Sequence, residues 1–144
     1  MRKIIVVLLS FVLFSTLSVT AQSNTTYKNV IDSSKTSECD EIFTYVEEMP
    51  QFPGGEAEMT KFIAENIQYP KATQDSGLQG AVYVRFIISD IGVINHIEIL
   101  RSFDESCSTE AKRVIKSMPL WKSGKQNGRP VCVYYTLPIR FALK

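Results

Sequence analysis

Several ingredients of enzyme active sites are scarce in this sequence. It has one histidine, His96, and three cysteines with no C-x-x-C pair. A histidine-activated nucleophile, a redox pair and a cysteine zinc ribbon therefore lack the residues they need. The formal net charge is only +1, which offers no broad basic face for nucleic acid. We expect no catalytic residue, no bound metal, no cofactor and no nucleic-acid partner.

The N-terminal residues have the pattern of an export signal. Arg2 and Lys3 precede an apolar stretch over residues 4–19, and Val19 and Ala21 occupy the two positions that a signal peptidase reads. We predict a cleaved signal peptide over residues 1–21 and a periplasmic mature chain. Its formal charge is −1, because the two lost cations are subtracted from +1. The alternative is an uncleaved inner-membrane anchor, although a stretch of about 16 residues is shorter than the roughly 17–25 that span a bilayer.

The cysteines allow more than one arrangement. Export permits disulfides, but an odd number leaves at least one cysteine unpaired or paired between chains. Cys107 falls on the apolar stripe of a predicted helix, where a buried thiol is expected. The pairing stays open at this point, and a homodimer joined through Cys39 or Cys132 is one alternative.

Composition divides the remaining chain into a leader and one domain. Residues 22–45 are rich in Ser, Thr, Asn and Asp and predict a flexible leader. Apolar and polar residues alternate weakly over Ile42–Val46, which allows a short strand there. Residues 46–144 have the apolar periodicity of a folded domain. Helices are predicted over residues 56–66, 70–77 and 104–118, strands over 80–89, 93–102 and 131–143, and a loop over 121–130.

This order of elements predicts an α+β fold. A hairpin and a third strand would form a three-stranded antiparallel sheet, covered on one face by helices in a two-layer sandwich. Gly54-Gly55 precedes the first helix without the later glycines or the Lys-Ser/Thr pair of a phosphate loop, so a tight turn is expected there.

The last strand contains a proline, which indicates an exposed edge. A proline lacks the N–H that a sheet interior requires, and is tolerated at an edge, a bulge or a strand's first residue. If Pro138 faces the open side, the even-numbered residues direct their backbone bonds outward. A visiting peptide could then pair with Cys132, Tyr134, Thr136 and Arg140. The alternative is that Pro138 only blunts the edge against aggregation.

Five ordered motifs carry a family resemblance. They are MPQFPGG at residues 49–55, NIQYP at 66–70, GLQGAV at 77–82, DIG at 90–92 and PLWKSGKQNG at 119–128. In this order they resemble the TonB C-terminal domain of the Bacteroidetes type, over roughly residues 46–143. The residues that match as structural motifs are Pro53, Gly54, Gly55, Tyr69, Pro70, Gly80, Gly92, Trp121 and Gly124. Trp121 is either a stacking platform for a ligand or, as we favour, a residue that closes the core.

The resemblance implies a non-enzymatic partner-binding role. Such domains bind a TonB-box segment of outer-membrane TonB-dependent receptors as a strand beside their last strand, in transmembrane transport of nutrients. Full transducers draw energy from ExbB and ExbD through an anchor helix and a long spacer. ExbB and ExbD are therefore implied as partners only if the N-terminus stays uncleaved. Here the proline-free leader reaches at most about 80 Å, which favours binding over force transmission. The alternative is an interaction module that binds another periplasmic protein or itself through the same edge.

The export prediction has a direct test. The N-terminal peptide of the protein purified from cells, sequenced by mass spectrometry, is expected to begin at Gln22 in the soluble periplasmic fraction. A chain that still begins near Met1 in the membrane fraction would support the anchored alternative.

Overall fold

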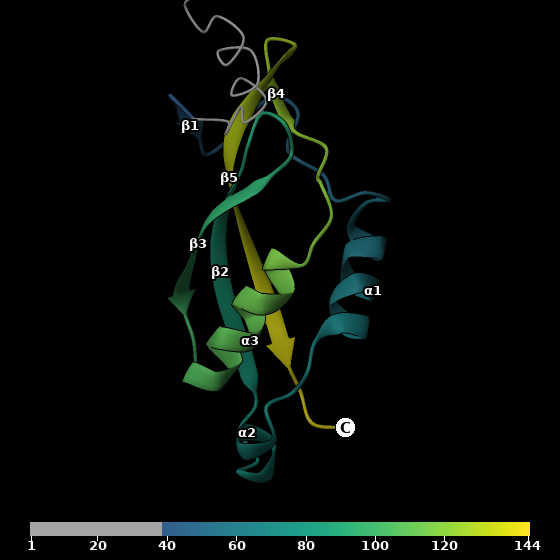
Figure 1. The fold of residues 1–144 in the computed structure, drawn as a ribbon, viewed down its shortest axis with the longest axis vertical. Helices are drawn as coiled ribbons and strands as arrows, with labels where there is room; N and C mark the ends of the chain where they lie inside the picture. The colour runs from purple at the N-terminus through teal and green to yellow at the C-terminus, as the bar shows by residue number, and fades with distance from the viewer. Residues whose placement is uncertain (1–38) are drawn as a thin grey trace, which may run out of the picture. The chain divides into compact units, whose positions relative to one another are not determined.

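The computed structural model describes residues 39–144, so the predicted signal peptide and most of the predicted leader lie outside the described residues. None of the helices within 39–144 is long and apolar enough to cross a membrane. Figure 1 shows the arrangement of the elements. The helices are α1 (Glu56–Asn66), α2 (Lys71–Asp75) and α3 (Glu105–Lys116), and the strands are β1 (Ile42–Phe43), β2 (Gly80–Ile88), β3 (Ile94–Arg101), β4 (Gly124–Gln126) and β5 (Arg129–Phe141).

The sheet is mixed and has more strands than the sequence predicted. Its order is β1-β5-β2-β3, with β4 also paired to β5. β5 runs antiparallel to β2 and to β4, whereas β1 runs parallel to β5. The α+β class is confirmed, but the three-stranded antiparallel sheet is wrong, because β1 and β4 add strands at the start of β5.

Both additional strands are too short to leave a periodic pattern. β4 has the sequence Gly-Lys-Gln within the predicted loop, and it forms because Asn127 and Gly128 make a two-residue turn into β5. Both turn residues have positive φ, 52° and 73°, as such a hairpin requires. β1 has only two residues, within the stretch where a short strand was considered. Its parallel partner lies some ninety residues away, so no local signal could place it in the sheet.

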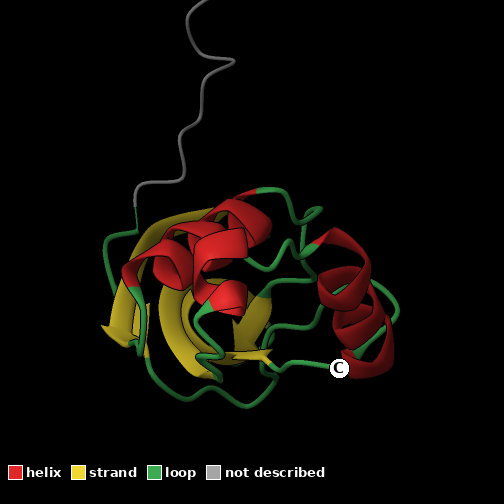
Figure 2. Ribbon diagram, turned by 90° about the horizontal axis from the view of Figure 1, so that it is seen from below, coloured by secondary structure: helices red, strands yellow, loops and turns green. Residues whose placement is uncertain are grey.

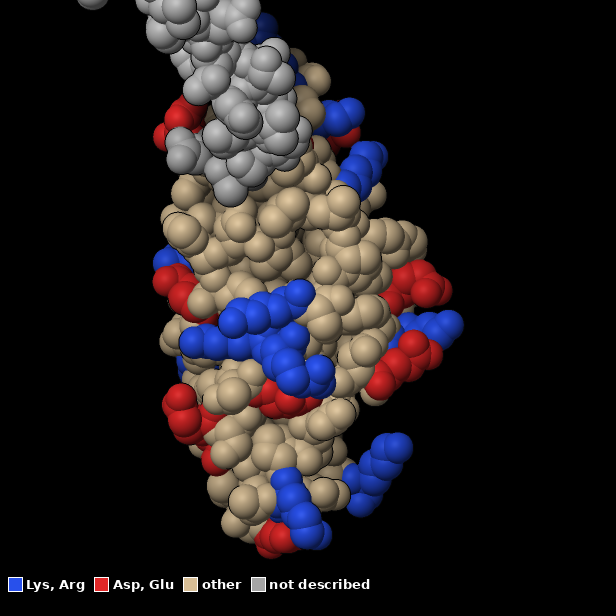
Figure 3. All heavy atoms as spheres, viewed as in Figure 1, with Lys and Arg blue, Asp and Glu red and all other residues tan. Residues whose placement is uncertain are grey.

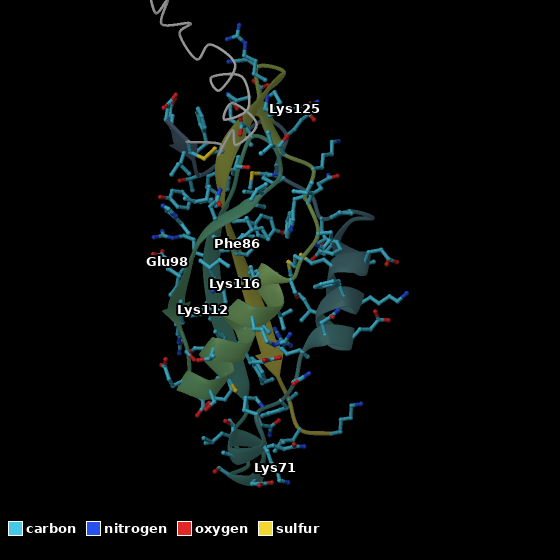
Figure 4. All side chains as sticks on the ribbon, in the orientation of Figure 1. Lys71, Phe86, Glu98, Lys112, Lys116 and Lys125 are labelled. Carbon is cyan, nitrogen blue, oxygen red and sulfur yellow. A yellow bond between two sulfur atoms is a disulfide. The ribbon has the colours of Figure 1, made fainter. Side chains whose placement is uncertain are left out.

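The core lies between the sheet and the helices. α3 packs on β2 and β3, and Figure 2 shows helices on one face of a strongly curled sheet. Alternate residues of β2 and β5 face this layer. Phe86 lies within it in Figure 4. The core side chains on these two strands are Val82, Val84, Phe86, Ile88, Val133, Leu137, Ile139 and Phe141, all at most 6% exposed.

The turn before α1 agrees with the prediction from the paired glycines. The Gly55 N–H donates to the Phe52 carbonyl at 2.8 Å, and Gly54 and Gly55 have φ of 83° and 88°. Pro53 and Gly54 therefore take the two central positions of a turn that requires positive φ at the second. The chain enters α1 directly afterwards, so the two glycines serve to reverse the backbone.

The NIQYP motif joins α1 to α2 and packs against the end of the sheet. α1 ends at Asn66 as predicted, and Pro70 is the N-cap of α2, one position earlier than expected. The Tyr69 hydroxyl donates to the Leu78 carbonyl, and its ring lies edge-on to Phe141 with centroids 5.5 Å apart. These contacts hold the helical connection against the last residues of β5.

The β2–β3 turn contacts the Trp121 segment directly. The Trp121 N–H donates to the Gly92 carbonyl at 2.9 Å, and Gly92 has φ of 84°. A Cβ atom at Gly92 would lie 2.0 Å from the Trp121 carbonyl oxygen, which is backbone and cannot rotate away. Glycine is needed here for its φ and for this close approach.

We predict that Gly92→Ala is markedly more destabilising than Gly77→Ala. Gly77 also has positive φ, 69°, but a Cβ there meets nothing within 4 Å, so it isolates the conformational cost of about 1 kcal/mol. Gly92→Ala should cost at least about 2 kcal/mol more, because the Trp121 backbone must move. Urea unfolding of both variants measures the difference, and equal losses would show that the close approach relaxes freely.

Candidate functional site

The two edges of β5 are used unequally. One edge pairs with β2 over residues 133–141. The other edge pairs with β1 at residues 132–133, and β4 pairs with β5 at residues 129–131. Within residues 39–144, no strand pairs with this second edge between Tyr134 and Phe141. An extended stretch of backbone with unpaired N–H and C=O groups is what a visiting strand requires.

The four residues predicted for this edge do not share one environment. Tyr134 is half-buried, whereas Thr136 and Arg140 are exposed with Pro138 on the face away from the helices. Cys132 is buried at 5% exposure, and β1 occupies the edge beside it. The structure thus groups Tyr134, Thr136 and Arg140 along the free edge, and Cys132 is already engaged within the chain.

A disulfide fixes the entry of the chain beside β5. Cys39 and Cys132 are bonded to each other, across a sequence separation of 93 residues. This pairing inside one chain corrects the alternative that either cysteine joins two chains. Together with β1, the disulfide holds residues 39–43 at the start of the free edge. The predicted leader boundary at residue 45 stays a prediction, although Ile42 and Phe43 pair with the sheet.

The charged groups beside Tyr134 are paired with each other. Arg85 of β2 forms an ion pair with Glu98 of β3 and lies over the Tyr134 ring, 5.0 Å from its centroid. Figure 4 shows Glu98 on β3. Figure 3 shows basic side chains gathered elsewhere, over α3, where Figure 4 labels Lys112 and Lys116. The free edge therefore carries a neutral, partly aromatic surface around Tyr134, and exposed Arg140 adds a positive charge farther along it.

The structural motifs support this edge from inside the core. Trp121 is 4% exposed, and its ring lies 4.9 Å from Tyr135, 5.6 Å from Phe52 and 5.8 Å from Phe86. Its role as a residue that closes the core is confirmed. Gly80 and Gly124 lie where a Cβ would overlap Phe103 and Val133, so close packing accounts for both positions. These residues shape the surroundings of β5 and do not line its free backbone.

Groups with catalytic potential are unsuited to chemistry. His96 is exposed on β3. Cys107 is fully buried, and this burial raises the pKa of its thiol to about 11, so the nucleophilic thiolate is rare at neutral pH. Within residues 39–144, His, Cys, Asp and Glu side chains form no cluster of three that could hold a metal ion.

The comparisons with known proteins identify a family. A family model described as Gram-negative bacterial TonB protein C-terminal matches residues 65–143. The chain belongs to this family. It is similar to two NMR solution structures of Helicobacter pylori TonB-CTD, each at 27% identity and a TM-score of 0.48. One match covers 61% of this chain and 92% of the solved chain, and the other 64% and 87%. No curated protein sequence matches the chain.

Membership of the TonB C-terminal family sets the general role. The family is non-enzymatic, its domain is periplasmic, and its members generally partner TonB-dependent receptors. The sequence prediction of the family and of a non-catalytic domain is therefore confirmed. Sequence reasoning missed Arg85, Met49 and Tyr135 as neighbours of the edge, since they come from three segments.

Removal of the disulfide should destabilise the TonB-like domain substantially. Its loop of about ninety residues places the loss of the Cys39→Ser and Cys132→Ser double variant near 3–5 kcal/mol. Chemical denaturation with and without reductant measures it, and Cys107→Ser is a control for the loss of a thiol outside the disulfide. If the free energy of unfolding of the wild-type protein is the same with and without reductant, the Cys39–Cys132 pairing is contradicted.

Proposed function

We propose that this chain is a periplasmic TonB-like domain that engages a TonB-box-like segment of an outer-membrane TonB-dependent receptor by strand addition to β5. Such engagement would serve transmembrane transport of nutrients. The observation that carries the proposal is the unpaired edge of β5 from Tyr134 to Phe141. Family membership supports the class of partner.

The register of β5 supports a particular set of outward-facing groups. β2 and β5 pair without a bulge, and Pro138 lies opposite Tyr83. Opposite residues in an antiparallel ladder alternate between pairs that exchange hydrogen bonds and pairs that do not. Since Pro138 has no N–H to give, we assign it to a pair without bonds. Tyr134, Thr136 and Arg140 then share its parity and direct their backbone groups to the free edge.

The opposite edge of the sheet is less suited to strand addition. Within β3, Asn95 pairs with Ile87 and Glu98 pairs with Arg85, so two residues of β3 oppose Phe86 alone. His96 lies in this bulge with φ of 49°. A bulge twists an edge away from regular pairing and is a common protection against unwanted strands. The regular free edge of β5 is therefore favoured over the β3 edge.

The proposal predicts a specific response of backbone amides. A receptor TonB-box peptide added to the labelled domain should shift the amide signals of Tyr134, Thr136 and Arg140, measured by heteronuclear NMR. The largest shifts are expected there because strand addition forms hydrogen bonds at those groups. Large shifts confined to β3, with the β5 signals unchanged, would show that the peptide binds the β3 edge and would contradict the proposal.

A proline at Thr136 tests the parity of β5. If the Thr136 N–H points outward, Thr136→Pro removes no bond to β2 and should cost at most about 2 kcal/mol. It should nevertheless weaken peptide binding strongly, whereas the Thr136→Val control keeps both the N–H and the affinity. Thermal unfolding and NMR titration give the two readouts. A Thr136→Pro domain that unfolds, beside a stable Thr136→Val domain, would reverse the assigned parity.

A further inference from the structure

Two hollows flank the free edge of β5 near its start. The outer hollow, of about 300 Å³, lies on the sheet face away from the helices and is lined by Arg85, Tyr134 and Thr136 among others. The inner hollow, of about 440 Å³, lies on the helix side and is lined by Phe52, Met59 and Tyr135 among others. Met49 and Tyr135 line both hollows, so these two side chains lie between them.

A strand added at this edge would use the two hollows alternately. Successive side chains of a strand point to opposite faces, and directly opposite residues of neighbouring strands lie on the same face. A peptide residue opposite Tyr135 therefore points into the inner hollow. The residues before and after it, opposite Tyr134 and Thr136, point into the outer hollow.

The inner hollow fits a large apolar side chain. Phe52 and Met59 are 7% and 5% exposed, and Met49 adds a flexible thioether at the rim. Burial first, and then the Glu56 carboxylate, raise the pKa of the Tyr135 phenol, so this wall is uncharged at neutral pH. Glu56 also lines the hollow and disfavours an acidic visitor.

The outer hollow fits an uncharged polar side chain. Its one basic group, Arg85, is already paired with Glu98 and stacked on Tyr134. The remaining surface offers the hydroxyl groups of Thr44, Tyr45 and Thr136 as hydrogen-bond partners. A visiting charge would find no free counter-charge here, and a large apolar group would cover these polar atoms.

β1 shows how this side of β5 accepts a strand. Phe43 pairs opposite Val133, and the next β5 residue on the same face is Tyr135. The pairing ends at Phe43, and Thr44 and Tyr45 then line the outer hollow. An added strand would thus continue in line with β1. Its residue opposite Tyr135 would lie on the same face as Phe43, which is the apolar residue opposite Val133.

We infer that the segment bound by this domain carries one large apolar residue opposite Tyr135, flanked on both sides by uncharged polar residues. The inference rests on the proposed strand addition and adds the side-chain chemistry that the edge selects. The alternating hollows carry it, since backbone pairing alone would accept any extended sequence.

Synthetic peptides test the pattern without a known receptor. The host is a nine-residue polythreonine peptide capped by lysines, compared with the same peptide carrying one central leucine. The leucine peptide should bind about tenfold more tightly by NMR titration, because one apolar side chain leaves water. Its methyl groups should give cross-relaxation signals to Met59. A second leucine placed next to the first should add less than twofold, because it faces the outer hollow.

Variants of the domain locate the selectivity. Met59→Ala should remove most of the preference for leucine, measured as the ratio of the affinities for the leucine peptide and the host peptide. Met118→Ala is the matched control, a methionine packed against the same core but outside both hollows. Peptides that shift the β5 amides with no preference for leucine would overturn this inference while the proposed function stands. If neither these peptides nor a receptor TonB-box peptide binds β5, both proposals fail.

Discussion

Nine consecutive residue pairs join β2 to β5, from Gly80 opposite Phe141 to Ile88 opposite Val133. This antiparallel pairing aligns two apolar faces so that alternate residues of both strands point toward the helices. Those side chains are almost fully buried, and α3 packs across them. Shifting β5 along β2 by one residue would turn the apolar set of β5 to solvent while that of β2 still faced the helices, so the packing of the core depends on this alignment.

The same pairing leaves β5 with one edge for other uses. Most sheet proteins protect such an edge, and here the chain protects only its beginning, with β1 and the Cys39–Cys132 disulfide. The β3 edge is protected by the bulge at His96. The remaining free segment is therefore short, regular and bounded by the chain's own strand, which limits where a partner strand can begin.

The aromatic cluster connects the family motifs to that segment. Trp121 contacts Phe52 from the turn before α1 and Tyr135 from β5, while its backbone meets the β2–β3 turn at Gly92. Motifs far apart in the sequence thus converge behind one stretch of β5. They pack around Tyr135 and beside the inner hollow.

The sequence alone determined the features that depend on local periodicity and backbone chemistry. Alternation in β2 and β5, the ends of α1, the Phe52–Gly55 turn and the Asp104 cap, which accepts from the Cys107 N–H at 3.0 Å, all follow from neighbouring residues. Only the tertiary structure decided the mixed sheet, the disulfide and the two hollows. β1 and β4 are too short for a periodic signal, and their partners are chosen by long-range pairing. For that reason the sequence predicts Cys132 on an open edge. The structure shows that Cys39 and β1 lie beside it.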